Sequence, residues 1–224
     1  MFDRISEWRF RRRLAALGES RHDLLRDYCE ANWTSVHIPL HEAALVALDF
    51  ELDGLGRDAH VLQVGWVGFN SGGISLAEAE SLDIRSVRRL DDGAVAVHGI
   101  VEERAREGHP LQEVLERLIP TLAGRVLVAH GAAIEAEVLA RTSRACFGQK
   151  IPLRTICTLQ LERKINPNLV GGDCYQLAAT RARYNLPPYP QHDALSDALG
   201  AAELLLAQAK TLPTDVRLAA VLGQ

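Results

Sequence analysis

The amino-acid sequence predicts an α/β protein in which a mixed, five-stranded β-sheet is flanked by helices, with a helical extension at the N-terminus. Three apolar runs rich in β-branched residues follow one another between residues 44 and 84, an order typical of antiparallel strands in a meander. From residue 110 onward, helical and strand-like patterns alternate, which is typical of strands that pair in parallel. Together the two halves favour one mixed sheet covered by helices.

Composition and charge narrow the class of protein. The chain has 224 residues, of which 47% are hydrophobic and 24% charged, so it suits one globular domain with an appendage, or two small domains. The formal net charge of −4 argues against a protein that coats duplex nucleic acid through bulk positive charge. Four cysteines without a C-x-x-C pair indicate free thiols in a reducing compartment. No apolar run has the length of a signal peptide or a membrane span, and we therefore expect a cytoplasmic protein.

Residues 1–42 form the expected N-terminal helical extension. Apolar side chains recur at helical spacing on both sides of Gly18, which predicts two short helices. The arginines at positions 9 and 11–13 could mark a nucleic-acid-binding arm. The extension as a whole holds seven arginines against seven acids, so we favour a solvated helix face that docks on the main domain through Trp8 and Phe10.

The main domain is expected to span residues 43–212, followed by a tail of residues 213–224. Residues 44–50 form a short apolar run, which is typical of a central strand buried on both faces. The next strands are predicted at residues 61–69 and about 74–84, on either side of a turn.

Helices and strands alternate in the second half of the main domain. Pro110 opens a helix whose apolar side chains share one face, and Gly124 ends it. Two more strands are expected at residues 125–129 and 153–157. Further helices are expected at residues 132–144, 158–164, 174–184 and 193–209.

Two carboxylates mark the end of the first predicted strand. Asp49 and Glu51 are two residues apart, so they point to one face of the strand while Phe50 points to the other. Adjacent acids at the end of a buried strand are costly unless a positive charge lies between them. Because hard oxygen ligands suit Mg²⁺ or Mn²⁺, the pair indicates a divalent cation; the alternative is a solvated strand end.

Two further motifs place acids near the starts of helices. Glu135 lies about one turn into the helix after the strand that ends Val128-Ala-His, where the helix N-terminus favours a carboxylate. Before the last long helix, a proline-rich stretch excludes helix, and Asp193 is a suitable N-cap. His192 is therefore expected in a loop and Asp197 in the first turns of the helix, so that the two side chains can converge.

The three motifs in this order resemble the DEDDh 3′–5′ exonucleases, a superfamily that includes the proofreading epsilon subunit of bacterial DNA polymerase III and ribonuclease T. The D-x-E pair, the acid after a "VAH" strand and the H-x4-D motif are the carriers of the resemblance, which runs from Leu45 to Leu206. In addition, His98-Gly99-Ile100 followed by Pro110 is similar to that family's "HGIT…P" stretch, which borders the nucleotide pocket.

The resemblance implies a ribonuclease H-like fold and hydrolysis of a 3′-terminal phosphodiester with two divalent cations, Mg²⁺ or Mn²⁺. Asp49 would bridge both cations, Glu51 and Asp197 would complete one site, and Glu135 would contribute directly or through water. His192 would act as the general base on the attacking water. Two cations and a histidine that titrates near neutral pH are a coherent set for this chemistry.

The resemblance also implies which residues hold the substrate. The expected substrate-binding residues are Leu52, Asp53, Gly54, Leu55, His98, Ile100 and His130. The substrate would be a 3′ end of single-stranded DNA or RNA, the product a nucleoside 5′-monophosphate, and a DNA polymerase a possible partner. DNA and RNA are not distinguished by these motifs.

Five residues in four stretches depart from the family pattern. Leu52 and Asp53 stand where two threonines are usual, Gly131 replaces an asparagine, Glu135 is one methylene longer than the usual aspartate, and Arg154 replaces the aspartate of a "D-T-L" stretch. Glu135 keeps its charge and its oxygen ligands, so an active enzyme with an unusual pocket is favoured. The alternative is a catalytically weakened nucleic-acid-binding or polymerase-accessory module of the same fold.

Positive charge is concentrated between the second and third motifs. Residues 141–183 carry eight Lys and Arg and two acids, a balance of 8 − 2 = +6, which leaves −10 for the rest of the chain. A basic flank beside an acidic metal centre would hold the phosphates of a nucleic-acid strand. The alternative, of equal weight, is a set of solvated helix faces that form no single patch.

Overall fold

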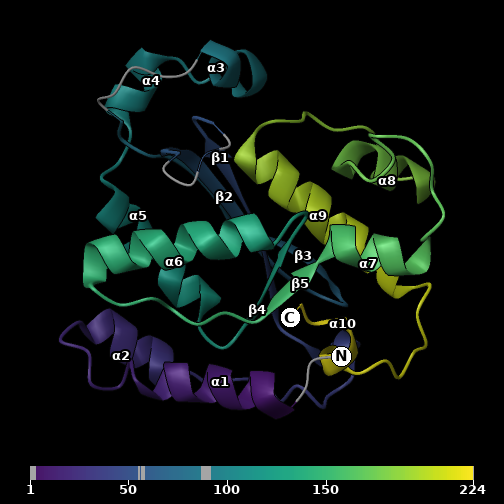
Figure 1. Ribbon diagram of the computed structural model, residues 1–224, viewed down its shortest axis with the longest axis horizontal. Coiled ribbons are helices and arrows are strands. Elements are labelled where there is room, and N and C mark those ends of the chain that lie inside the picture. Colours follow the sequence, from purple (N-terminus) through teal and green to yellow (C-terminus); the bar gives the residue numbers. More distant parts are fainter. Residues whose placement is uncertain (1–3, 55, 57–58, 87–91, 224) are drawn as a thin grey trace.

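The computed structural model describes residues 4–54, 56, 59–86 and 92–223, and its centre is a five-stranded mixed sheet (Figure 1). The strand order is β3-β2-β1-β4-β5. The strands are β1 (Leu45–Leu52), β2 (Val61–Asn70), β3 (Gly73–Asp83), β4 (Val126–Ala129) and β5 (Thr155–Cys157). β1 pairs antiparallel with β2 and parallel with β4, β2 pairs antiparallel with β3, and β4 pairs parallel with β5. The predicted fold class is confirmed.

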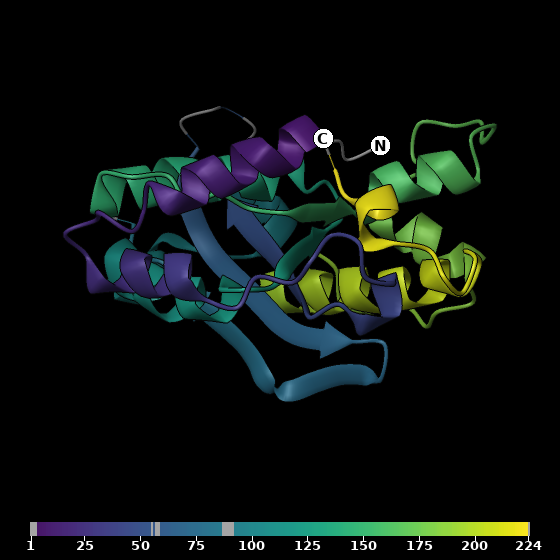
Figure 2. The same cartoon turned by 90° about the horizontal axis from the view of Figure 1, so that it is seen from below.

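Helices cover both faces of this sheet. The helices are α1 (Arg4–Ala15), α2 (Asp23–Glu30), α3 (Asp92–His98), α4 (Glu102–Glu107), α5 (Leu111–Leu122), α6 (Ala133–Phe147), α7 (Thr158–Ile165), α8 (Leu177–Arg183), α9 (Ala194–Ala209) and α10 (Leu218–Val221), with a short 3-10 turn at Leu40–Glu42. Figure 2 shows the long β2 and β3 bending out beyond the helices, and β3 is accordingly exposed along much of its length. In the described part of the chain, no helix combines the length and the apolar character that a membrane crossing requires.

The two faces of β1 belong to two separate hydrophobic cores. Val46, Leu48 and Phe50 pack with α1, α2, α5 and α6. Leu45 and Ala47 pack with α7, α9 and α10. Because both faces are buried, the strand reads as a continuous apolar run rather than as an alternating pattern.

The N-terminal extension packs into the first of these cores. Phe10 and Leu14 of α1 are buried there, and the buried Arg154 beside them donates two hydrogen bonds of 2.6 and 2.8 Å to the carboxylate of Glu7. The Arg154 guanidinium also lies 4.4 Å from the centre of the Phe10 ring.

The expected docking role of Trp8 is wrong. Its side chain is 58% exposed, whereas Phe10 is 5% exposed. Residues two apart on an α-helix lie about 200° apart around its axis, so they cannot both face the same core. Phe10, and not Trp8, packs into the core here, together with Leu14 one turn further on.

Candidate active site

Asp49 and Glu51 lie at the end of β1, where the strand carries them to the face that α9 covers. Their neighbour Phe50 packs into the core on the opposite face, as the two-residue spacing predicts. On the adjacent strand β2, the residue paired with Asp49 is Gly65 and the residue paired with Glu51 is Gln63. The two acids therefore project between the sheet and the start of α9.

Gly65 and Gln63 bring α9 close enough to complete the site. A Cβ atom on Gly65 would lie 2.1 Å from the backbone nitrogen of Leu195, so only glycine admits the first turn of α9 at this depth. The Gln63 side-chain oxygen accepts a hydrogen bond of 3.0 Å from the backbone nitrogen of Ala194. Neither residue was expected from the sequence to take part in the site. The available signal was an isolated glycine within a strand, which often marks a close backbone approach.

Asp197, one turn into α9, joins Asp49 and Glu51. Oxygen atoms of the three carboxylates lie within 4.8 Å of one another. Asp193 caps the helix, because its side chain accepts a hydrogen bond of 3.0 Å from the backbone nitrogen of Ser196, as the sequence predicts. These residues come from β1 and α9, which are about 140 positions apart in the chain.

Glu135, in the first turn of α6, lies outside this group of three but close enough to Asp49 to act on its charge. Its side chain is 5% exposed, and its Oε2 atom has no hydrogen-bond partner in the described residues. Among the charged neighbours of Asp49, Glu135 has the largest effect on the pKa of that carboxyl group. A buried, unpartnered carboxylate oxygen near Asp49 is suited to contact a cation.

The electrostatics of the cluster are unfavourable to four negative charges. Burial and then repulsion from Glu135, Asp197 and Glu51 raise the pKa of Asp49 well above its usual range. Burial, followed by the charges of Asp197 and Asp193, raises the pKa of Glu51 to about 7. Burial raises the pKa of Glu135 to about 7. The oxygen donors match what Mg²⁺ and Mn²⁺ bind, and a divalent cation would relieve the repulsion, so the residues present fit that group.

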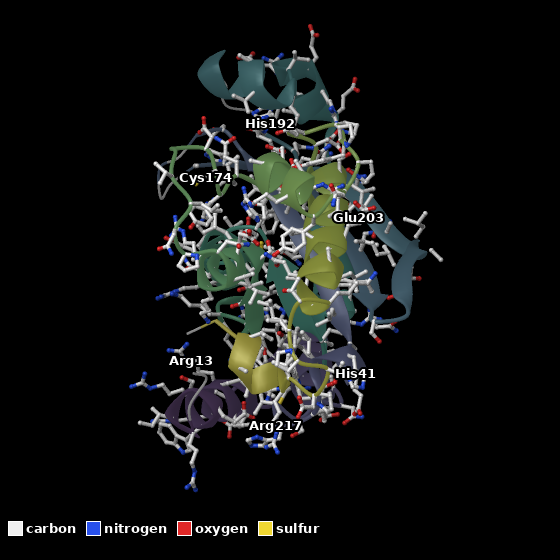
Figure 3. The ribbon with its side chains drawn as sticks, turned by 90° about the vertical axis from the view of Figure 1, so that its right-hand side faces the viewer. Arg13, His41, Cys174, His192, Glu203 and Arg217 are labelled. Carbon is white, nitrogen blue, oxygen red and sulfur yellow. The ribbon has the colours of Figure 1, made fainter. Side chains whose placement is uncertain are left out.

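His192 lies in the loop before α9, as predicted. Its backbone has φ +62°, and its backbone nitrogen donates a hydrogen bond of 2.8 Å to Oδ2 of Asp197. The residue is exposed, so its ring is accessible from solvent at the edge of the acid cluster. Figure 3 shows His192 close to the N-terminal end of α9.

The second oxygen of Asp197 is held by a residue that the sequence analysis did not identify. The hydroxyl of Tyr189 donates a hydrogen bond to Oδ1 of Asp197. The guanidinium of Arg181 lies 4.6 Å from the centre of the Tyr189 ring and donates a hydrogen bond of 2.9 Å to the carbonyl of Gly200 in α9. Arg181 and Tyr189 thus brace the carboxylate that α9 contributes. No local sequence signal marks this contact, because it depends on how the proline-rich loop folds back.

Two of the predicted substrate-binding residues lie near His192. Burial lowers the pKa of His98, the charges of Arg104 and His192 lower it further, and the charge of Asp53 opposes them. His192 and Asp53 are therefore each within electrostatic reach of His98. The Nε2 atom of His98 is buried without a hydrogen-bond partner among the described residues, which leaves it available to a ligand.

The other predicted substrate-binding residues have different surroundings. Leu52 and Gly54 are half-buried after β1, and Leu55 lies outside the described residues. Ile100 is 1% exposed and packs with Leu62 and Ala105. Both ring nitrogens of His130 have protein partners: Nε2 donates to the Tyr175 carbonyl at 2.7 Å, so Nδ1 accepts from the Thr158 hydroxyl at 2.9 Å.

The basic segment of residues 141–183 does not present all its charges on the surface. Arg154 pairs with Glu7, Arg181 with Glu203 and Arg183 with Glu162. Four of the remaining cations, Arg144, Lys150, Arg163 and Lys164, are exposed. The structure therefore favours structural roles for three of the eight basic residues.

Comparison with known proteins identifies the family. The sequence pattern of an exonuclease family, RNase T, matches residues 46–205, which include all four acids and His192. The chain belongs to the RNase T exonuclease family. This result confirms the resemblance to the DEDDh 3′–5′ exonuclease superfamily.

Two bacterial relatives support membership of this exonuclease family. A DNA polymerase III subunit epsilon-like protein of Rhodobacter capsulatus is 27% identical over 171 residues, 75% of this chain and 24% of that protein. A PolC-type DNA polymerase III of Mycoplasmopsis pulmonis is 29% identical over 126 residues, 54% of this chain and 8% of that protein. The chain thus spans about a quarter of the first relative and less than a tenth of the second.

Solved structures share the fold of the exonuclease domain. Exonuclease X in complex with 5′ overhanging duplex DNA has a TM-score of 0.63 and 24% identity, over 79% of this chain and 98% of the other. E. coli Exonuclease I in complex with a dT13 oligonucleotide has a TM-score of 0.64 and 13% identity, over 76% of this chain and 41% of the other.

Proposed function

We propose that this protein is a metal-dependent 3′–5′ exonuclease that hydrolyses the 3′-terminal phosphodiester of single-stranded or frayed nucleic acid and releases nucleoside 5′-monophosphates. The observation that carries the proposal is the meeting of Asp49, Glu51 and Asp197 within 4.8 Å, with the buried Glu135 beside Asp49. Three acids from β1 and α9 that meet in this way, with a fourth from α6 near Asp49, serve no evident packing purpose.

The four carboxylates are assigned to holding two divalent cations. Asp49 would be the central ligand, Glu51 and Asp197 would complete one site, and Glu135 would contribute directly or through water. When bound, Mg²⁺ or Mn²⁺ supplies positive charge that activates a water and stabilises the leaving 3′ oxygen. The tyrosine and backbone hydrogen bonds to Asp197 keep this carboxylate aimed at the cluster.

His192 is assigned as the general base that accepts the proton of the attacking water. A neutral imidazole can take a proton near neutral pH, and this one lies at the open edge of the cluster. Because the backbone nitrogen of His192 bonds to Asp197, the position of the base is tied to the position of an acid that holds the cations. The proton acceptor and the charged centre therefore move together.

The terminal nucleotide is assigned to the surface beside His192. The segment from Leu52 to Leu55 follows the two strand acids, and His98 and Ile100 belong to the motif that borders the pocket in the family. The unpartnered Nε2 of His98 supports a ligand contact there. His130 is assigned to shaping this edge of the site, since its two hydrogen bonds connect the end of β4 to residues 158 and 175.

The substrate is DNA or RNA, and a replicative DNA polymerase is the proposed partner. The polymerase proposal is supported by the names of the two relatives, both of which are DNA polymerase III proteins. The nucleic-acid proposal is supported by solved structures of the same fold that hold DNA.

The test is a product analysis on matched 5′-labelled DNA and RNA oligonucleotides with Mg²⁺ or Mn²⁺. We expect a ladder of shortened products from the 3′ end, 5′-monophosphates as the released species, and no reaction with a chelator. Asp49→Asn should abolish the ladder, while Asp215→Asn, which changes an exposed acid far along the chain, should not. Binding of oligonucleotide without any shortening would support the accessory-module alternative instead.

A further inference from the structure

Helix α1 presents the accessible indole of the molecule. Trp8 is 58% exposed, whereas Trp33 and Trp66 are 8% and 2% exposed. The guanidinium of Arg12 lies 5.3 Å from the centre of the Trp8 ring. Trp8 takes no part in the buried side of α1, which Phe10 and Leu14 supply, and Ile5 of the same helix is 57% exposed as well.

The same helix is strongly basic within an acidic protein. Residues 4–18 contain five arginines and one acid, in a chain of net charge −4. That acid, Glu7, is already paired with Arg154 and Arg11. Arg9 and Arg13 make no ion pair within the described residues, so their charges are free to meet an anion.

A groove runs beside these arginines. Its volume is about 750 Å³, and it lies between α1, the alanines Ala136 and Ala140 of α6, and the segment of residues 149–155 that leads into the edge strand β5. Lys150 adds a further exposed cation to its lining. A second hollow of about 360 Å³ shares Arg9 and Arg13 with the groove and adds Trp8 and Arg12 to the surface.

We propose that α1 and this groove form a second binding site for single-stranded nucleic acid, with a base stacked on Trp8 and phosphates on Arg9, Arg13 and Lys150. Stacking on an exposed aromatic side chain next to free cations is the way single strands are bound without regard to sequence. Bases are exposed for stacking only in a single strand. A concave, basic groove suits a narrow polymer better than a flat membrane surface.

The arginines of this site lie far from His192, whereas the groove itself extends to Ala136 in the first turn of α6, next to Glu135. Arg154, against which α1 packs, precedes β5, and its carbonyl accepts from Leu127 near the start of β4. The four acids lie instead where β1 ends and where α6 begins. Figure 3 shows Arg13 and His192 at opposite ends of the molecule. In the context of the proposed function, this site would hold an upstream part of a long substrate; binding at α1 itself does not depend on hydrolysis.

The experiment measures tryptophan fluorescence of the full chain carrying Asp49→Asn, in chelator, during titration with dT30 or rU30. We expect both oligonucleotides to quench the emission, since Trp8 is accessible and the other two indoles are buried. Trp8→Phe should remove the quenching while affinity, measured by anisotropy of a labelled oligonucleotide, changes less than about twofold. Trp8→Ala should weaken binding about fivefold or more, because one stacked base is lost.

Charge reversal supplies the matched control. Arg13→Glu should weaken binding and make the slope of log affinity against log salt less negative by about 0.7. Lys210→Glu changes the net charge by the same amount at an exposed position, in the hollow between α9 and the β2–β3 turn. It should leave the affinity for the oligonucleotide and its salt dependence nearly unchanged. Equal effects of the two reversals would overturn the proposal, and so would quenching by phosphatidylserine vesicles but not by oligonucleotides.

A last measurement separates this proposal from the proposed function. The protein without the Asp49 change should hydrolyse the p-nitrophenyl ester of thymidine 5′-monophosphate with Mn²⁺, and Arg13→Glu should leave that rate unchanged. Loss of hydrolysis in every form would contradict the exonuclease proposal while the α1 titrations still stood. If Arg13→Glu lost oligonucleotide binding and hydrolysis of the p-nitrophenyl ester together, the two sites would not be separate.

Discussion

Two buried glutamates show what distinguishes a structural carboxylate from a functional one in this protein. Glu162, between α7, α8 and α9, is fully buried, and its oxygens accept hydrogen bonds from Gln208, Asn166, Tyr184 and Arg183. Burial alone would raise its pKa, but these hydrogen bonds outweigh burial and leave the pKa below its usual value.

Glu135 is almost as deeply buried and has the opposite character. One of its oxygens has no partner in the described part of the chain, and burial raises its pKa to about 7. The protein therefore satisfies a buried charge where it serves packing. It leaves charges unsatisfied at the end of β1, where a cation can complete them. A buried acid is thus informative about function only when its hydrogen bonds are counted.

The largest expected effect is on hydrolysis, and it tests whether the acid cluster differs from the surroundings of Glu162. Asp49→Asn should lower the proposed hydrolysis by about a thousandfold, since it removes the central charge of the metal site. The metal-free protein should at the same time unfold a few degrees higher, because repulsion in the cluster is relieved. Activity assays and thermal unfolding in chelator check both results.

Glu162→Gln is the matched change in the satisfied region. It should lower the free energy of unfolding by about 1–3 kcal/mol, because Arg183 and Tyr184 lose their charged acceptor. Cation affinity, measured by Mn²⁺ titration, should stay unchanged. If Asp49→Asn instead destabilised the metal-free protein, the acid cluster would be a structural network like that of Glu162.

The next effect concerns the close approach of α9. Gly65→Ala should displace the first turn of α9, because the new Cβ would lie against the Leu195 backbone. Overpacking of this kind costs about 1–3 kcal/mol, and the shift of Asp197 should lower Mn²⁺ affinity by about a hundredfold. Gly172→Ala, whose Cβ would meet no atom within 4 Å, is the control for both the stability and the Mn²⁺ affinity. Unchanged Mn²⁺ affinity in Gly65→Ala would show that Asp197 is not needed at this position.

A smaller effect compares two tyrosines that each donate to a carboxylate. Tyr189→Phe should weaken Mn²⁺ binding by about tenfold, because Asp197 loses the hydrogen bond that orients it. Tyr184→Phe removes a similar bond of 2.9 Å to Glu162 and should lower only the unfolding temperature. The two variants are compared by Mn²⁺ titration and calorimetry. Equal losses of cation affinity would refute a positioning role for Tyr189.

The smallest effect is a pH dependence of stability. The folded-state pKa values of Glu51 and Glu135, about 7, lie above the unfolded value of 4.5. The folded protein therefore holds more protons between these pH values, and its metal-free stability should fall as pH rises from about 4.5 to 7. Mn²⁺ displaces these protons, so the stabilisation by Mn²⁺ should grow over the same range. Calorimetry at pH 5.5 and 8 checks the sign; a larger Mn²⁺ stabilisation at the lower pH would contradict it.

Local sequence was enough to predict the five strands, most of the helices and the four acids, whereas α3, α4 and α10 were not predicted. The apolar run of β1, the proline start of α5 and the Asp193 cap are properties of neighbouring residues, and the structure confirms them. The spacing of Asp49 and Glu51 determined that both would share a face, because strand geometry alternates at every residue. The expectation that Trp8 would dock on the main domain with Phe10 was wrong, because residues two apart on a helix point to nearly opposite sides.

Only the tertiary structure decided what holds these acids together and what remains free. Gly65, Gln63 and Tyr189 act on groups that lie 8 to 131 positions away, and such contacts have no signature in local patterns. Which arginines are paired and which are free also depends on the tertiary structure. Arg154 is buried against Glu7, whereas Arg13 lines an open groove. Composition sets how many charges a chain carries, whereas burial and pairing set which of them can act.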